Sequence, residues 1–504
     1  MKQLILSEWL LTQLSHHKFP TRMANHRRVY ETIRRAITEQ VLPSGSRLPS
    51  TRSMAADLNV SRNTILAAFD QLLDEGYVAA KTGSGTFVCY KQTDALFKQV
   101  ENPAKNASNL QSADGNIGLS KRGLAASNSP DNQRNGQEVQ PFTPGDDDYS
   151  RFPIALWRRL LNRQWRALDP ALLDSSHDGG YLPLRQNIAD YLRVSRAVNL
   201  SVNQVIITSG TQQSIDLCAR LLTDEGDIAW VENPCYWAAR RVLEVNGLQL
   251  HPISIDAEGM APTTADFRVK PRLIYTTPSH QYPKGMVMSY GRRRLLLDYA
   301  DSQQAWIIED DYDSEFRFEG RPISSLQGMD EHGRVLYLGT FSKVMYPGIR
   351  LGYMVIPAQL VDAFKNGLYE LQRPGQVMIQ AALADFIEEG HFASHIRRLK
   401  QTYGERRRLL QAALAPIINV GARLSPVDSG LHLVVEFDAH IDDVKVAAMA
   451  AAQDLRVYPL SHYCFGNQPE KGLIIGYAYA ATESVTYYGN VLAEVIQTTL
   501  KAQQ

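Results

Sequence analysis

The segment TFSKVMYPGIRLGY at residues 340–353, with EDDYDSEF upstream at 309–316, decides how most of this chain is interpreted. A lysine that forms a Schiff base with an aldehyde cofactor needs an acid beside the pyridine nitrogen, because the acid keeps the ring an electron sink. Lys343 and Asp310 are placed to be this pair, and Tyr312 is placed to bond the phenolic oxygen of the cofactor. The sequence therefore predicts Schiff-base chemistry at Lys343.

Short apolar runs alternate with amphipathic stretches around this segment. The runs are VIIT (205–208), IAWV (228–231), LIYTT (273–277), WIIEDD (306–311) and VLYLG (335–339). Such alternation predicts a mainly parallel sheet covered by helices, with a smaller α/β portion beyond about Pro374. Asp310 then lies at the carboxyl end of its strand, where open α/β sheets bind ligands.

A phosphate site is predicted at the turn SGTQQS (209–214), which follows VIIT and begins a helix. Backbone N–H groups at a helix N-terminus bind anions. The residues expected to hold a cofactor phosphate are Gly210, Thr211, Gln212, Ser342 and Arg350, with Arg350 as the charge partner. Each motif alone is weak, because a lysine after serine is usually a surface lysine and a Gly-Thr turn is usually only a helix start. Their order and shared position at strand ends support the joint interpretation.

A stretch rich in Asn, Ser, Gly, Gln and Asp separates this body from the start of the chain. Few bulky apolar residues occur there, so it cannot bury enough surface to offset its ordering entropy. We therefore expect a small head over residues 1–90, a flexible linker over 91–140 and a body over 141–504.

The head has the spacing of a helix–turn–helix. Val29, Ile33, Ile37 and Val41 recur every four residues, which predicts a helix ending near Leu42–Pro43. A short helix is expected from Thr51 through Leu58, and Ser61 is expected to cap a second one. The runs YVAAK and TFVCY, on either side of TGSG, predict two strands around a hairpin. No helix follows GSG at 83–85, so a hairpin tip is a better interpretation than a dinucleotide loop.

The second helix of such a unit lies in the major groove, where its first turn reaches base edges. Here that turn holds Arg62, Asn63 and Thr64, and arginine can read guanine as asparagine can read adenine. The side chains expected to hold phosphates are Arg47, Arg52 and Lys81. A basic helical domain for protein contacts is the alternative, but the turn, recognition helix and wing occur together and favour double-stranded DNA.

These motifs carry a family resemblance. Residues 29–88, through SGSRLPSTRSMAADLNVSRNTILAAFDQLLDEGYVAAKTGSGTFV, resemble the GntR winged-helix family, and the body resembles a fold-type I aminotransferase. Head and body together, over about 27–90 and 141–500, look like the MocR group of GntR regulators. The implied fold is an α+β winged helix–turn–helix joined to an α/β aminotransferase-like domain with a small C-terminal α/β subdomain.

The resemblance also implies a cofactor, pyridoxal phosphate, and roles for further residues. It makes Lys343 the Schiff-base lysine, pairs Asp310 with the pyridinium nitrogen and stacks Tyr236 of ENPCY on the ring. It places His280 and Gln281 of TPSHQYPKG on the phenolic-oxygen side. Tyr236 as a core aromatic and His280 as a packed loop residue are the alternatives. A homodimer that binds a DNA operator and exchanges an amino-compound effector with the lysine is also implied.

One departure from the aminotransferase pattern affects the effector. Aminotransferases usually hold the substrate carboxylate with an arginine in a stretch like L-R-L-G-F, but here GLIIGYAYA (472–480) has Ile474 at that place. The hypothesis is that the effector lacks this carboxylate, binds it elsewhere, or is a B6 vitamer. Control of vitamin B6, γ-aminobutyrate, taurine or D-alanine metabolism stays open. The alternatives are an active aminotransferase with a DNA-binding head and a DNA-binding scaffold without cofactor.

Composition excludes several classes of protein. Lys and Arg number 53, as do Asp and Glu, so the formal net charge is zero. The overall charge therefore does not indicate a protein that binds nucleic acid or membranes. The four cysteines lie far apart, without the short paired spacing of a zinc site, and a reducing cytoplasm fits. No segment approaches the ~20 apolar residues that a membrane span needs. We expect a cytoplasmic protein with no metal and no membrane partner.

Overall fold

The computed structural model describes residues 9–14, 23–81, 83–89, 118–127, 139–167, 170, 179–318, 324–372, 375–425 and 429–503. The chain divides into two compact units, 1–117 and 118–504. Most of the expected linker lies outside the described residues. Helix α6 (Lys121–Ser127) falls within it and contacts α10 of the second unit, and Arg122 forms an ion pair of 3.2 Å with Glu225.

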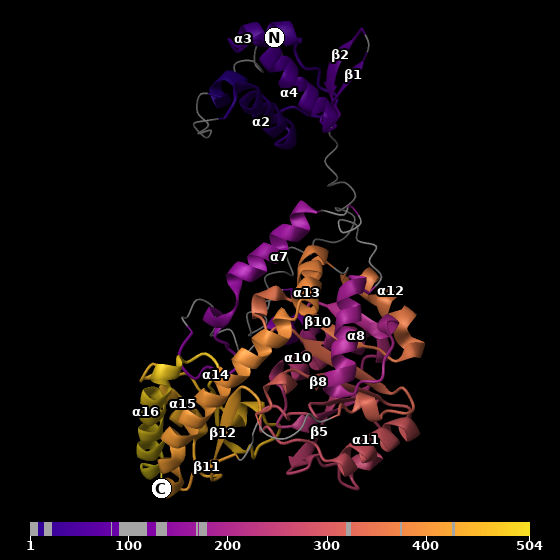
Figure 1. The fold of residues 1–504 in the computed structure, drawn as a ribbon. Helices are drawn as coiled ribbons and strands as arrows, with labels where there is room; N and C mark the ends of the chain where they lie inside the picture. The colour runs from indigo at the N-terminus through magenta and orange to yellow at the C-terminus, as the bar shows by residue number, and fades with distance from the viewer. Residues whose placement is uncertain are drawn as a thin grey trace. The chain divides into compact units, whose positions relative to one another are not determined.

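The first unit packs α2, α3 and α4, with a further helical segment at residues 9–14, beside a two-stranded hairpin (Figure 1). Its elements are α2 (Asn25–Thr38), α3 (Thr51–Asp57), α4 (Arg62–Asp74), β1 (Val78–Lys81) and β2 (Gly85–Val88). Serine hydroxyls cap the two helices of the helix–turn–helix, because Ser50 accepts from the N–H of Ser53 at 3.1 Å and Ser61 from that of Thr64 at 3.2 Å. The expected helices, caps and strands are therefore present.

The first helix ends earlier than its apolar period predicts. Val29, Ile33 and Ile37 are buried in the core of the first unit, but Val41 is 45% exposed. Helix α2 ends at Thr38, and Gln40 has a φ of 58°. This left-handed residue turns the chain out of the helix, so the expected end near Leu42–Pro43 is wrong.

The second unit contains an eight-stranded sheet in the order β3-β10-β9-β8-β7-β4-β5-β6. Its strands are β3 (Val205–Thr208), β4 (Ile228–Asn233), β5 (Gln249–Asp256), β6 (Gly259–Met260), β7 (Leu273–Thr276), β8 (Trp306–Asp311), β9 (Val335–Thr340) and β10 (Gly352–Val355). The five apolar runs of the sequence are all strands of this sheet. The pairs from β9 through β8, β7 and β4 to β5 are parallel, as the near-continuous apolar runs predict.

Strand β10 inserts antiparallel between β3 and β9. Gly352 lies opposite Thr208 on one side and Thr340 on the other. This pairing brings the turn after β3 beside the loop that joins β9 to β10. Two segments 130 residues apart in sequence thus meet at one edge of the sheet.

Alternate residues of the strands face opposite layers of helices. In β3, Val205 and Ile207 join a core with side chains of α8 and α13, whereas Ile206 joins a core with those of α9 and α12. The helices of this unit, besides α6, are α7 (Ile154–Arg166), α8 (Leu182–Arg196), α9 (Thr211–Leu222), α10 (Trp237–Val245), α11 (Tyr290–Gln303), α12 (Val361–Gln372), α13 (Val377–Glu388), α14 (His391–Leu414), α15 (Asp443–Ala451) and α16 (Thr482–Lys501). Both faces of the sheet are therefore covered.

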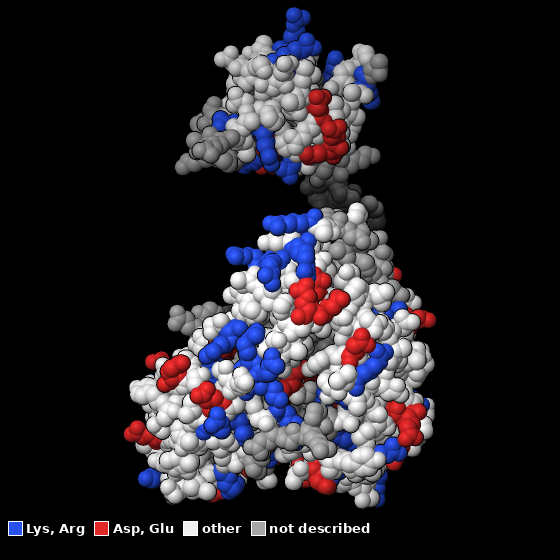
Figure 2. All heavy atoms as spheres, viewed as in Figure 1, with Lys and Arg blue, Asp and Glu red and all other residues white. Residues whose placement is uncertain are grey.

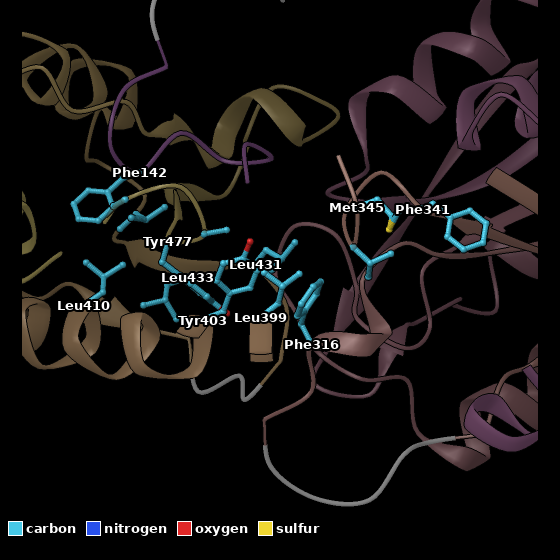
Figure 3. Close-up of a cluster of buried hydrophobic side chains, with 14 of the residues drawn as sticks. Phe142, Phe316, Phe341, Met345, Leu399, Tyr403, Leu410, Leu431, Leu433 and Tyr477 are labelled. Carbon is cyan, nitrogen blue, oxygen red and sulfur yellow. The ribbon is translucent and has the colours of Figure 1, made fainter. Parts of the chain in front are cut away.

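A second, antiparallel sheet forms near the end of the chain in the order β11-β12-β14-β13. Its strands are β11 (Arg423–Leu424), β12 (His432–Phe437), β13 (Tyr458–Pro459) and β14 (Lys471–Gly476). One core runs from Phe341 and Met345, beside the large sheet, past Tyr403 of α14 to Leu433 and Tyr477 at the small one (Figure 3). The expected small C-terminal α/β portion thus shares one hydrophobic core with one face of the large sheet.

Charge is distributed unevenly over the second unit. Figure 2 shows Lys and Arg gathered over α7 and α14, which expose Arg158 and Arg159 on one helix and Arg397 and Arg398 on the other. The balanced total thus hides local basic surface. Within the described part of the chain, no helix has the length and apolarity to cross a bilayer.

Candidate functional site

A cavity of about 380 Å³ lies at the carboxyl ends of β3, β4, β7, β8 and β9. Nine of the ten predicted cofactor residues line it, namely Gly210, Thr211, Gln212, Tyr236, Asp310, Tyr312, Ser342, Lys343 and Arg350. The tenth, His280, does not. This edge is the one at which open α/β sheets bind ligands.

The Asp310 carboxyl sits at the end of β8 and is half satisfied. The Tyr275 hydroxyl of β7 donates to its Oδ2 at 2.7 Å, whereas its Oδ1 has no partner among the described residues. Burial raises the pKa of Asp310 to about 7, and the Tyr275 hydrogen bond opposes this rise. The free oxygen is thus available to a donor N–H inside the cavity.

Tyr312 lines the cavity with His280 behind it. The Tyr312 hydroxyl lies 2.9 Å from His280 Nδ1, and Asp313 Oδ2 lies 2.9 Å from the same nitrogen. Gln281 is also buried outside the lining, where its amide donates to the carbonyl of Pro234 at 2.9 Å. Both residues of the TPSHQYPKG loop therefore support the wall from behind.

The backbone around the predicted phosphate site takes unusual conformations. Gly210 has a φ of 121°, which a residue with a side chain rarely adopts, and it precedes the first turn of α9. The first N–H groups of α9, at Thr211 and Gln212, have no partner within the helix. Arg350 has a left-handed φ of 49°, and a Cβ on Gly352 would lie 2.8 Å from the Gly210 Cα. The close approach thus requires glycine at 352, whereas the positive φ favours glycine at 210.

Lys343 follows β9 and extends to a segment that precedes the sheet in sequence. Its Nζ donates to the carbonyl of Gly145 at 2.7 Å and lies 3.9 Å from Asp147 Oδ2. Pro144, Gly145 and Asp146 line the cavity with it. The amine is therefore held at the cavity wall by residues that the sequence motifs do not include.

Aromatic side chains form the wall opposite the large sheet. Tyr236, which precedes α10, packs edge-on against Tyr282 with ring centroids 5.3 Å apart. His432 of β12 bonds the Pro283 carbonyl at 2.7 Å, and burial lowers its pKa to about 3, so this imidazole is neutral. The wall therefore carries phenols and a neutral ring.

Ile474 lies beneath this wall rather than in it. On β14 it is fully buried and pairs with Val434 on one side and Tyr458 on the other. Among the described residues, the cations that line the cavity are Lys343 and Arg350. Ile474, which the resemblance places where aminotransferases have a carboxylate-binding arginine, is thus occupied with apolar packing.

A buried ion pair supports the strand end that carries Asp310. The Arg196 Nε of α8 lies 2.7 Å from Asp311 Oδ2, and the side chains are 7% and 2% exposed. Asp311 also accepts from the hydroxyls of Tyr337 and Ser314. The guanidinium thereby fixes the end of β8 to α8.

In the first unit, the predicted base-reading residues begin α4. Arg62 and Asn63 are exposed, and within the described chain the side chain of neither makes a hydrogen bond or ion pair. The Thr64 hydroxyl lies 2.8 Å from the Ser61 hydroxyl, so it is engaged in the cap. Arg62 and Asn63 are therefore the two free polar groups of this turn.

The predicted phosphate-binding residues lie on three exposed elements. Arg52 is in the first turn of α3, Arg47 pairs with Phe87 of β2 through a backbone bridge, and Lys81 Nζ lies 5.3 Å from the Phe87 ring centre. All three side chains face solvent. Their exposure is compatible with contacts to a polyanion.

Comparison with known proteins gives the family. A model of bacterial regulatory proteins of the gntR family matches residues 25–88, and one of aminotransferase class I and II matches 149–470. The probable rhizopine catabolism regulatory protein MocR of Rhizobium meliloti is 39% identical over 453 residues, which are 90% of each chain. The chain belongs to the MocR subfamily of GntR regulators. The family resemblance drawn from the motifs is thereby confirmed.

Other relatives of this MocR-type regulator agree. The pyridoxine biosynthesis transcriptional regulator PdxR of Corynebacterium glutamicum is 31% identical over 92% of this chain and 94% of its own. A multiple substrate aminotransferase from Thermococcus profundus, at 24% identity, superimposes with a TM-score of 0.69 over 76% of this chain and 98% of its own. The predicted fold, a winged helix–turn–helix with a fold-type I aminotransferase domain, is confirmed.

The cofactor of this aminotransferase family is pyridoxal phosphate. Its pyridine nitrogen, when protonated, donates a hydrogen bond, and Asp310 Oδ1 is a buried acceptor without a partner. Its phosphate is an anion, and the N-terminus of α9 lies in the same cavity as Arg350. The residues of this MocR-type protein therefore fit the cofactor of its family.

Sequence reasoning missed the other residues that line the cavity, some from the quoted motifs and some from other parts of the chain. They are Pro144, Gly145, Asp146, Trp237, Tyr275, Thr277, Tyr282, Thr340, Pro347, Leu431, His432, Tyr458 and Tyr463. Tyr275 carried a usable signal, because it is the one phenol in the apolar run LIYTT next to the strand of Asp310. The strap 144–146 and the small sheet carried none, since the fold alone brings them here.

Proposed function

We propose that this regulator senses pyridoxal phosphate or an amino compound through a Schiff base on Lys343, and that it thereby controls vitamin B6 or amino-compound metabolism. The observation that supports this most directly is that Lys343 and the half-satisfied Asp310 share one cavity. The printed roles of two relatives, rhizopine catabolism and pyridoxine biosynthesis, agree with such metabolism.

Absorption spectroscopy tests the Schiff base. We expect visible absorption from the purified protein that disappears on borohydride reduction, with the cofactor trapped on the peptide containing Lys343 in mass spectrometry. Trapping on a different lysine would move the site. A colourless protein that cannot be reconstituted would refute the sensor and leave only the DNA-binding function.

The effector, we propose further, is an amine without an α-carboxylate. Lys343 and Arg350 are assigned to the cofactor, so the described lining offers no further cation to a carboxylate. Asp146 lines the same cavity and would repel one. A carboxylate moved from water to such a place without a partner is strongly penalised.

Matched pairs of ligands test this. Titration calorimetry with the loaded protein should show that tyramine, phenethylamine and putrescine bind at least about tenfold more tightly than tyrosine, phenylalanine and ornithine, because only the latter carry the unpaired carboxylate. Tight, stereoselective binding of an α-amino acid would contradict the proposal.

We propose a cytoplasmic homodimer in which the bodies pair and each body carries one head. Two heads on one duplex require two half-sites, whose spacing the dimer sets. Effector binding changes head placement only through different affinities for the two arrangements. Light scattering and footprinting, with and without effector, test the assembly. A monomeric protein that protects a single half-site would refute it.

Arg62→Ala should weaken specific operator binding by about 1–3 kcal/mol if this guanidinium reads a base. Arg35→Ala is the matched control, because Arg35 is also an exposed arginine of the first unit but is paired with Glu39 at 2.9 Å. Titration of labelled operator by fluorescence anisotropy measures both. An unchanged affinity and footprint for Arg62→Ala would reject base reading.

An active aminotransferase that carries a DNA-binding head is the second candidate, because Lys343 and Asp310 are suited to turnover as well as to sensing. Conversion of amine to keto acid by the loaded protein distinguishes it. Sustained multiple turnover would favour the enzyme, and stoichiometric exchange without turnover would favour the sensor.

A further inference from the structure

Asp147 is a buried carboxyl without a hydrogen-bond partner. It lies in the segment that lines the cavity, is 4% exposed, and neither of its oxygens has a partner among the described residues. The cation beside it is Lys343, with Nζ 3.9 Å from Oδ2. Because an unpaired buried charge is costly, the charge of Asp147 depends on the state of this one amine.

The neighbouring Asp148 shows what a structural carboxyl looks like in this segment. It accepts from the Arg406 guanidinium at 2.6 Å and from the backbone of Ser150 at 3.2 Å. The carboxyl of Asp147 caps no helix and accepts from no backbone N–H in the described chain. A purely structural role therefore explains Asp148 but does not explain Asp147.

The groups facing Asp147 come from three elements besides its own. Burial raises the pKa of Asp147 to about 7, Lys343 opposes the rise, and Asp146 and Asp313 add to it. Tyr403 of α14 also faces the carboxyl, which raises the pKa of the phenol further. Asp147 can thus take up or release a proton near neutral pH.

We propose that Asp147 is the proton partner of Lys343. In the conformation seen, the two side chains form an ammonium–carboxylate pair. For Lys343 to attack the cofactor aldehyde, its ammonium passes a proton to Asp147, and the neutral amine then forms the C=N bond while water leaves. The proton stays in the cavity and neutralises Asp147, which would otherwise be a lone buried anion.

The reverse step occurs when an effector amine replaces Lys343 on the carbon that was the aldehyde carbon of the cofactor. Lys343 departs as a neutral amine and recovers the proton from Asp147. It then returns to the pair and to the Gly145 carbonyl, which it bonds at 2.7 Å in this structure. Asp147 therefore stabilises the released lysine. This inference rests on the Schiff base proposed for Lys343.

A double-mutant cycle in the cofactor-free protein tests the pair by itself. Asp147→Asn, Lys343→Met and the double variant are unfolded in denaturant at pH 8, where Asp147 is ionised. We expect the two single effects not to add, because each leaves a partner unpaired. Because the pKa of Asp147 is raised in the folded state, its protonation stabilises the fold fully at pH values below the ordinary pKa of an aspartate. This contribution is lost as the pH rises through about 7. Asp147→Asn should flatten this slope, and strict additivity with an unchanged slope would overturn the pairing.

Proton counting during cofactor loading tests the transfer. Calorimetry at pH 7 in buffers of different ionisation enthalpy should show that Asp147→Asn releases up to about one proton more than wild type, because Asn cannot keep the lysine proton. Asp147→Glu should restore the count. Asp443→Asn is the control, since Asp443 is also buried and lies 3.4 Å from a lysine, Lys471, outside the cavity lining.

Asp147→Asn should also need about tenfold more effector amine than wild type to displace Lys343 from half of the Schiff bases. A tenfold change corresponds to one pKa unit of lost stabilisation. Equal proton counts and equal displacement in wild type and Asp147→Asn would overturn the transfer. If wild type forms no Schiff base at all, the proposed function fails instead, while the cofactor-free cycle still reports on the pair. If Asp147→Asn does not fold, Asp147→Glu with the wild-type proton count carries the test.

Discussion

Lys343→Ala is expected to fold like the wild type and to lose its visible absorption completely. Removal of the amine removes the nucleophile, and no other lysine lines the cavity in the described chain. Circular dichroism should be unchanged, because Lys343 is partly exposed and belongs to no strand or helix. Borohydride should then trap no cofactor on the protein.

The matched control for this prediction is Lys445→Ala. Lys445 is an exposed lysine of α15 outside the cavity lining, so its loss should leave absorption and trapping at the wild-type level. Persistence of the absorption band in Lys343→Ala would place the Schiff base on another lysine. The same result would remove the premise of the proton transfer to Asp147.

Arg196→Met should lower the free energy of unfolding by about 3–5 kcal/mol, because it leaves Asp311 buried without its cation. Removing one partner of a buried pair costs more than removing both, since the remaining charge has no water to solvate it. Denaturant titration measures the loss. Because Asp311 adjoins Asp310 on β8, cofactor binding should weaken as well.

Two further variants isolate the cause. Arg294→Met removes a partly exposed arginine paired with Asp298 at 3.2 Å and should cost less than about 1 kcal/mol. The double variant Arg196→Met with Asp311→Leu should recover much of the lost stability. A single Arg196→Met variant as stable as Arg294→Met would show that the buried pair contributes little.

The sequence revealed those strands that have an apolar run of their own. The five predicted strands were found because their side chains are buried on both faces, which leaves an unbroken apolar signature. Strand β10 was missed because GYMV directly continues the motif around Arg350 and shows no boundary. Strand β5 was missed because its mixed run QLHPISID is only partly buried near one side of the sheet.

The sequence predicted those residues of the candidate site that lie at or near the end of a recognisable strand. Asp310 lies at the end of β8, Tyr312 directly follows it, and Lys343 comes shortly after β9, so position and residue type together marked them. Asp147 and His432 could not be found in this way, because they lie far in sequence from Lys343. Only the packed fold brings Asp147 beside Lys343 and His432 to the cavity wall. The position of His280 behind Tyr312 also depends on packing that no motif encodes.

The insertion of β10 between β3 and β9 has a consequence for the order of assembly on the ribosome. Gly210 is synthesised early. The turn that contains it can lie beside the loop of Arg350 only after Gly352 has been synthesised and β10 has paired with β3 and β9. The winged head, complete by Val88, needs no later segment for its own core. We therefore expect nascent chains to complete the winged head well before the cavity that Gly210 and Arg350 line, and a truncation before β10 to leave the head folded and this cavity incomplete.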